Sequence, residues 1–200
     1  MGNIWGIHQL VPHPDTPPKA IEQVGVQIFG FDLQAIALEY SAAPFHALAL
    51  PAEVKPARVD GLWNTTCFEA FFRDENSDAY VELNFSPSFA WAAYSFDRYR
   101  EGMADLPTRL PPEIMAYLPA PRRGAMSELW RRSRGTASSP DSYFLSAEFV
   151  PPPFTFSLMA LSAVIEEIDG TKSYWALRHP PGAPDFHHRD CFALELPALA

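Results

Sequence analysis

Proline is the residue that most restricts how this chain can fold, because it occupies 21 of the 200 positions. Proteins contain about 5% proline on average, and a proline inside a helix removes a hydrogen-bond donor and clashes with the preceding turn. A helix bundle is therefore incompatible with this sequence. Fifteen phenylalanines, seven tyrosines and five tryptophans instead suit short strands joined by proline-bounded loops. We expect an all-β protein.

The length and composition of the chain point to one folded domain. Two hundred residues is the length of a single domain, and a hydrophobic content of 48% with 20% charged residues provides enough apolar surface for a sizeable core. The net charge of −9 repels phosphate backbones, so we expect no nucleic-acid partner. No apolar run approaches the roughly 20 residues of a membrane span, and we expect no membrane partner. The sequence leaves open whether the protein forms a homodimer.

The amino terminus and the cysteines indicate the compartment. The first residues, MGNIWGIHQLVPHPD, lack the basic stretch and the apolar run of a secretory signal. The two cysteines, Cys67 and Cys191, belong to no Cys-x-x-Cys or Cys/His metal pattern. We therefore expect a cytoplasmic protein with two buried free thiols.

Alternating and continuous apolar runs predict ten or eleven short strands. Turn residues separate these runs, and Asp169-Gly170 is the strongest hairpin turn. The pattern predicts an immunoglobulin-like or jelly-roll β-sandwich of two antiparallel sheets with long proline-rich loops, with any helix confined to 97–135. The predicted strands are 5–11, 24–29, 34–40, 45–50, 67–72, 79–86, 90–96, 143–150, 154–167, 173–177 and 192–196.

The fifth to seventh predicted strands form an antiparallel meander, because short turns join them. Their period of two places Glu69, Glu82 and Asn84 on the face opposite the apolar one, together with either Trp91 or Tyr94. Two carboxylates on neighbouring strands have three interpretations. They could be the acid and the nucleophile of a glycosidase, which lie roughly 5–10 Å apart. They could accept hydrogen bonds from sugar hydroxyls, or simply be satisfied on a wet face.

The segment 178–190 is a second concentration of polar groups. It contains Asp185, His187, His188 and Asp190, and imidazoles and carboxylates are ordinary ligands of zinc and iron. Their spacing matches no standard metal motif. We therefore expect a structural loop whose imidazoles bond to the backbone, with no metal, and keep a metal site as the alternative.

The segment 120–139 is rich in arginine, and glycine, serine and proline surround the arginines. We expect a mobile surface excursion that is dispensable for folding, because buried arginines need partners that the single Glu128 cannot supply. A patch that binds an anion or a nucleic acid is the alternative. Trp130 could dock this excursion onto the domain as a lid.

Three tryptophans lie beside the polar clusters in the sequence. Trp63, Trp91 and Trp175 could each offer a ring face on which a sugar stacks, while nearby carboxylates and amides bind its hydroxyls. Packing in the core is the alternative for each of them.

The stretch LWNTTCFEAF, residues 62–71, resembles the W-x-x-D-x-[VF]-E-x-F strand of DOMON-like domains. This superfamily includes the family 9 carbohydrate-binding modules and haem-binding cytochrome domains. The resemblance spans 5–196 and implies an immunoglobulin-like β-sandwich with a binding role rather than a catalytic one. Further stretches resemble a bacterial subgroup of the superfamily: YVELNFSP (80–87), AWAAY (90–94), YREGM (99–103), WAL (175–177) and PDFH (184–187).

The resemblance implies two kinds of ligand. The sugar-binding modules clamp their ligand between two tryptophans, of which Trp63 matches the first, whereas the second position here offers Phe186-His187. The haem-binding relatives use Met with His or Lys as axial ligands, and Met103 with His187 is the pair available here.

From these observations we predict a non-catalytic module for a small carbohydrate, without a cofactor. The alternative is a haem- or metal-binding domain with a redox or sensing role, led by Met103, His187 and His188. A glycosidase that uses Glu69 and Glu82 is a third hypothesis. The predicted ligand-binding residues are Trp63, Glu69, Glu82, Asn84, Trp91, Arg100, Trp175 and His187.

Overall fold

The computed structural model describes residues 3–31, 35–118, 141–151 and 156–196. In these residues the fold is all-β, as predicted, and the only helices are short 3-10 turns. No helix in this part of the chain has the length and apolar character needed to cross a bilayer. The arginine-rich excursion predicted at 120–139 lies outside the described residues.

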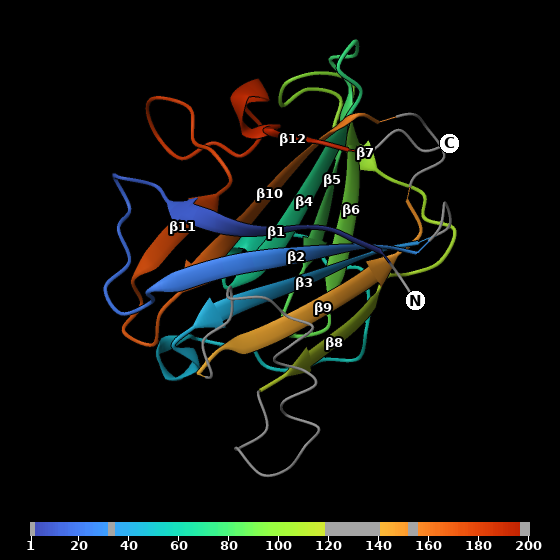
Figure 1. The fold of residues 1–200 in the computed structure, drawn as a ribbon. Coiled ribbons are helices and arrows are strands. Elements are labelled where there is room, and N and C mark those ends of the chain that lie inside the picture. Colours follow the sequence, from blue (N-terminus) through green and yellow to red (C-terminus); the bar gives the residue numbers. More distant parts are fainter. Residues whose placement is uncertain (1–2, 32–34, 119–140, 152–155, 197–200) are drawn as a thin grey trace.

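Two antiparallel sheets face each other (Figure 1). Sheet A has the order β1-β2-β3-β9-β8, and sheet B has the order β7-β6-β5-β4-β10-β11, with β12 also paired to β10. The end of β1 pairs with β11, so the sheets join along one edge. The strands are β1 (Asn3–Pro12), β2 (Gln23–Phe31), β3 (Ala35–Ala43), β4 (Cys67–Arg73), β5 (Tyr80–Phe85), β6 (Trp91–Phe96), β7 (Ala104–Asp105), β8 (Glu113–Tyr117), β9 (Tyr143–Phe149), β10 (Leu158–Glu166), β11 (Lys172–Ala176) and β12 (Leu194–Glu195).

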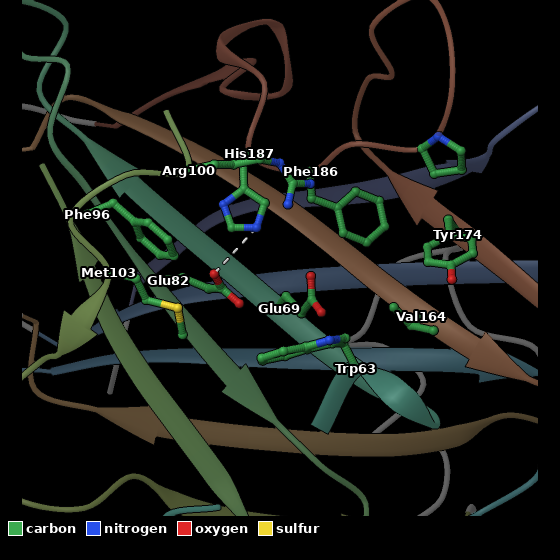
Figure 2. Close-up of a pocket in the computed structure, with 11 residues that line it drawn as sticks. Trp63, Glu69, Glu82, Phe96, Arg100, Met103, Val164, Tyr174, Phe186 and His187 are labelled. Atoms are coloured by element: carbon green, nitrogen blue, oxygen red, sulfur yellow. Dashed lines mark ion pairs between the residues drawn. The ribbon is translucent and has the colours of Figure 1, made fainter. Parts of the chain in front are cut away.

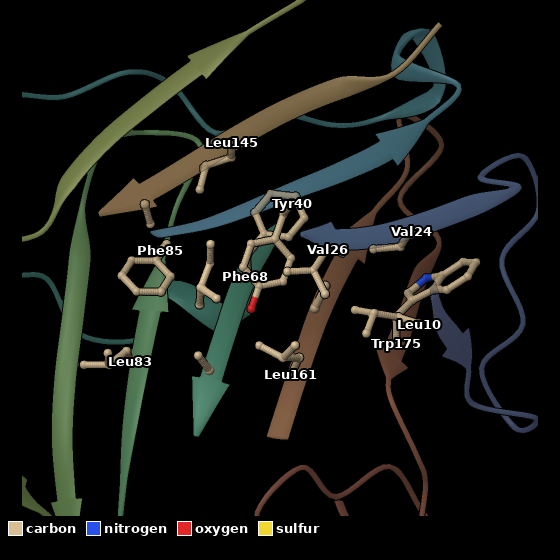
Figure 3. Packing of buried hydrophobic residues seen from close by; sticks show 14 of the residues in the cluster. Leu10, Val24, Val26, Tyr40, Phe68, Leu83, Phe85, Leu145, Leu161 and Trp175 are labelled. Carbon is tan, nitrogen blue, oxygen red and sulfur yellow. The ribbon is translucent and has the colours of Figure 1, made fainter. Parts of the chain in front are cut away.

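The main core lies between the two sheets, where the apolar faces of their strands meet (Figure 3). Tyr40 from sheet A stacks on Phe68 from sheet B, with ring centroids 4.9 Å apart. Phe149 meets Phe72 edge to face at 5.8 Å and stacks on Phe85 at 5.6 Å. Such aromatic pairs fill the space between two packed sheets and fix how the sheets face each other.

Most predicted strands are confirmed, and the Asp169-Gly170 turn joins β10 to β11 as expected. One of these predictions is wrong. Residues 45–50 contain the 3-10 turn η2 (Phe45–Ala47) instead of a strand, because Pro44 precedes it and the Phe45 backbone N–H is taken by the Asp141 carbonyl. In addition, the strands β7 and β8 lie in the described part of 97–135, where the sequence pattern predicted no strand.

The outer face of sheet B carries a second apolar cluster, which positions the candidate site. The strands β4, β5, β6 and β10 supply its floor, and Phe186, Cys191 and Phe192 from the segment after β11 belong to the same cluster. Cys67 and Cys191 are both free and buried there, as predicted. The fold therefore creates a covered pocket on the side of sheet B that faces away from sheet A.

Candidate functional site

A pocket of about 310 Å³ lies on this outer face of sheet B (Figure 2). Glu69 and Glu82 rise from β4 and β5, with His187 on one side of them and Trp63 on the other. Sequence reasoning had selected five of the lining residues. The full lining is Trp63, Glu69, Glu82, Phe96, Arg100, Met103, Val164, Tyr174, Pro184, Phe186 and His187.

Strand register brings the two carboxyls together. Glu69 pairs directly with Asn84 across β4 and β5, so their side chains leave the sheet on the same face. Glu82 is two residues from Asn84 and therefore shares that face. Ser162 of β10 lies opposite Glu69 on its other side. The sheet thus presents two carboxyls, an amide and a hydroxyl as one polar row beneath the pocket.

Burial controls the protonation of this carboxyl pair. Glu69 is 3% exposed and accepts a hydrogen bond of 3.1 Å from the Ser162 hydroxyl. Burial and the neighbouring Glu82 raise the pKa of Glu69 well above its usual range. Glu82 accepts a 2.7 Å hydrogen bond from the Asn84 amide, and burial raises its pKa to about 7. Two such carboxyls retain a proton at neutral pH, so the pair can both donate and accept hydrogen bonds.

His187 reaches the pocket from the loop above the sheet. The hydroxyl of Tyr80 lies 2.8 Å from its Nδ1 atom, and Nε2 lies 3.7 Å from Oε2 of Glu82. Burial, with the nearby charge of Arg100, lowers the pKa of His187 to about 4, so the ring is neutral at pH 7. A neutral ring that accepts from Tyr80 carries its proton on Nε2, which faces the Glu82 carboxyl.

Asp185 holds the polar rim together. Its carboxylate accepts a 2.6 Å hydrogen bond from the Tyr99 hydroxyl, a 2.8 Å bond from the Arg100 guanidinium and a 3.1 Å bond from the His187 backbone N–H. These bonds tie the turn after β6 to the loop after β11. The arrangement makes Asp185 a positioning residue for Arg100 and His187, a role that the sequence did not reveal.

Trp63 forms one wall of the pocket. It lies in the 3-10 turn η3 (Leu62–Asn64), which follows Gly61 at a φ of +74°. This left-handed conformation favours glycine and lets the chain turn back over the sheet. The Trp63 ring meets Tyr94 edge to face at 6.2 Å and stays 39% exposed. It therefore offers an open aromatic surface beside the carboxyl pair.

The structure does not place Trp91 or Trp175 in the pocket. Trp91 pairs across strands with Phe85, and Trp175 pairs with Ala163, so both side chains point into the core between the sheets. They are 7% and 3% exposed and offer no face to a ligand. The prediction that a sugar stacks on Trp91 or Trp175 is therefore wrong. Asn84 is fully buried and reaches the site only through Glu82.

Phe96 and Tyr174 line the pocket but were not predicted from the sequence, and Phe186 was named only through the family resemblance. The three rings supply apolar walls around the carboxyls. Phe96 and Tyr174 point outward by the same period of two that identified Glu82. Counting alternate residues along β6 and β11 could therefore have found them. Phe186 lies in the covering loop, and no periodicity predicts which loop residues fold inward.

The histidines that would hold haem or a metal have other partners. Met103 and His187 line the same pocket, but the His187 ring already contacts Tyr80 and faces Glu82. His188 accepts a 3.2 Å hydrogen bond from the backbone N–H of Asp190, as expected for a structural loop. Within the described ranges, no three His, Cys, Asp or Glu residues are grouped to bind a metal. His187 does not fit as an axial ligand without losing its contacts with Tyr80 and Glu82.

This chain resembles known proteins in its structure rather than in its sequence. No family model and no curated protein matches the sequence. A crystal structure from Bacteroides uniformis, of a protein to which carbohydrate binding is ascribed, is 14% identical with a TM-score of 0.63, and the match covers 94% of this chain and 84% of that one. This likeness shows a shared fold.

Two further matches are looser. Both are structures of a family 9 carbohydrate-binding module from Caldicellulosiruptor kristjanssonii, one with cellotriose and one with glucose. Each is 10% identical over 84% of this chain, and they are matched over 70% and 72% of their own length. Their TM-scores are 0.39 and 0.41.

Proposed function

We propose that this protein is a non-catalytic module that binds a small carbohydrate in the pocket between Trp63 and His187, and that it belongs to the DOMON-like superfamily. The observation that carries the proposal is the open Trp63 ring beside the Glu69–Glu82 pair. A sugar ring has apolar C–H faces and a rim of hydroxyls. An aromatic wall with a few convergent polar groups complements both parts.

The polar groups of the pocket suit hydroxyls that donate and accept. An ionised carboxylate accepts hydrogen bonds, whereas a protonated carboxyl and the Arg100 guanidinium donate them. Glu69 and Glu82 are also fixed by Ser162 and Asn84, so little side-chain entropy is lost when a ligand binds. The pocket volume of about 310 Å³ is at the small end for ligand sites. We expect a short saccharide and a Kd between roughly 1 mM and 1 μM.

The test is calorimetry with a panel of neutral mono- and disaccharides, after a glycan array has selected them. Trp63→Ala is expected to weaken binding about ten-fold or more, because it removes the aromatic wall. Phe45→Ala is the matched control, since Phe45 is similarly exposed at 37% and lies outside the pocket. Binding unchanged by Trp63→Ala would refute the site.

Two further arms separate the alternative functions. Incubation with the selected saccharide is expected to leave it intact. Hydrolysis that Glu69→Gln abolishes would instead identify a glycosidase. In a haemin titration the protein is expected to leave the Soret band of free haemin unchanged, and a saturable shift of that band that is lost in the variant His187→Ala would identify the haem-binding alternative.

A further inference from the structure

A second pocket, of about 300 Å³, lies beside the first. His187 lines both pockets, so its ring separates them. The second pocket differs in charge, because the guanidinium groups of Arg73 and Arg189 both line it, together with His188. No part of the carbohydrate proposal uses these residues.

Arg73 is the unusual member. It is the last residue of β4 and is only 7% exposed. Its guanidinium lies over the Phe192 ring, 5.1 Å from the centroid. Its Nε atom is buried and has no hydrogen-bond partner among the described residues. A buried donor without a partner is costly and rare in folded proteins, so this N–H is available to a ligand.

Arg189 adds a second positive charge to the same pocket. Its proximity, together with burial, lowers the pKa of Arg73. Among the described residues neither arginine forms an ion pair, although the whole chain carries a net charge of −9. Like charges held together in an acidic protein repel each other, and an anion between them would relieve that repulsion.

The acidic residues nearby leave this charge incompletely balanced. Asp78 lines the pocket but forms no ion pair with either arginine, and its side chain is exposed. Asp78 and, after it, Asp74 favour the charged form of Arg73. Asp190 faces His188, with Oδ2 3.7 Å from Nδ1. Among the described residues, none of these carboxylates lies within ion-pair distance of either guanidinium group.

We propose that the second pocket binds an oxyanion group, a carboxylate, sulfate or phosphate, between Arg73 and Arg189. Guanidinium groups bind such anions through short charge-assisted hydrogen bonds. The group could be a free anion or the acidic substituent of a saccharide whose ring occupies the first pocket, since His187 lines both pockets. The oxyanion site stands on its own geometry, whereas the saccharide-borne source rests on the proposed function.

The test is a titration of the full chain, labelled with ¹⁵N, with sodium sulfate at constant ionic strength. The Arg73 Nε–Hε resonance is expected to shift in a saturable way. Arg189→Gln is expected to weaken sulfate binding about ten-fold, the effect of losing one charged hydrogen bond. Arg178→Gln is the matched control, because it removes the same charge at an exposed residue that lines neither pocket. Asp78→Asn is expected to tighten binding about two- to five-fold by removing a repelling carboxylate.

The sources of the anion are separated by titrating glucose, glucuronate and sulfate in parallel. Glucuronate binding at least ten-fold tighter than both others would support an acidic saccharide that spans the pockets. Sulfate binding as tightly as glucuronate would support a free anion, and failure of glucose and the other neutral saccharides in that case would refute only the proposed function. If neither sulfate nor glucuronate shifts the Arg73 resonance, or if Arg178→Gln weakens binding as much as Arg189→Gln, the oxyanion site is refuted even where glucose binds.

Discussion

The Nε2 atom of His187 lies 3.7 Å from Oε2 of Glu82, in a site that buries both side chains. Burial lowers the pKa of His187 to about 4 and raises the pKa of Glu82 to about 7. Near neutral pH the imidazole is therefore uncharged, while the carboxyl beside it is close to its midpoint. Glu82 is the group through which the protein is expected to sense pH.

The first prediction concerns stability against pH in the variant Glu82→Gln. The folded protein holds the Glu82 proton more tightly than the unfolded chain, so this contribution to stability is complete below about pH 4.5 and is lost as pH rises through 7. The free energy of unfolding of the wild type, relative to Glu82→Gln, is expected to fall between pH 5 and pH 8. Urea unfolding at several pH values measures this difference.

The control for that measurement is Glu75→Gln, which removes the same charge from an exposed turn. The difference between wild type and this variant is expected to stay flat over the same pH range. His187 and the other titrating groups are present in every protein compared. A wild-type advantage over Glu82→Gln that grows with pH would contradict the assignment.

The second prediction concerns Glu167, which is 2% exposed at the end of β10. Its carboxylate accepts backbone hydrogen bonds from Lys19 at 2.7 Å and Ala20 at 2.8 Å, which fix the loop before β2. Glu167→Gln puts an N–H₂ group against one of these donors and is expected to cost about 2–3 kcal/mol of stability. Asp169→Asn removes the exposed ion pair with Lys19, while its Oδ1 keeps the hydrogen bond from the Thr171 N–H, so it is expected to cost clearly less than Glu167→Gln. If the two substitutions lowered the free energy of unfolding equally, the Glu167 carboxylate would not be what holds the loop before β2 in place.

The third prediction concerns the contact between the two sheets. The buried Tyr40 hydroxyl donates a 2.7 Å hydrogen bond to the backbone carbonyl of Glu69, directly behind the candidate site. Tyr40→Phe keeps the stack on Phe68 and removes this bond, so we expect a loss of about 1 kcal/mol, or roughly 2–4 °C in Tm. Thermal unfolding measures it. An unchanged Tm would indicate that the hydroxyl contributes nothing to holding the sheets together.

The positions of the carboxyls could be predicted because they depend on strand periodicity alone. Within one strand, the alternation of Glu82 and Asn84 with Val81 and Leu83 fixes which side chains share a face. The facing of Trp91 depends on the turn before it, where Phe89 has a φ of +70°. That turn pairs Trp91 with the inward-facing Phe85. A turn one residue longer or shorter would have placed Trp91 on the outer face of sheet B. The sequence alone does not give the length of that turn.

The contacts that the covering loop makes with the sheet could not be predicted. Asp185 joins Arg100 to His187 across 85 residues of chain, and Arg73 meets Phe192 at a still larger separation. Such contacts follow from how the sheet and its loops are arranged in space. Proline and histidine in the segment indicated a loop with polar content, but they gave no indication of which pocket each side chain would line.

The most direct test of carbohydrate binding at this site follows the indole N–H resonances of the ¹⁵N-labelled protein during titration with the selected saccharide. The Trp63 indole, assigned with Trp63→Ala, is expected to shift in a saturable way because its ring is exposed at the pocket. The indoles of Trp91 and Trp175 are expected to stay in place, because both rings lie in the core between the sheets. A saccharide that binds without moving Trp63, or that moves the two core indoles as much as Trp63, would contradict the proposed site.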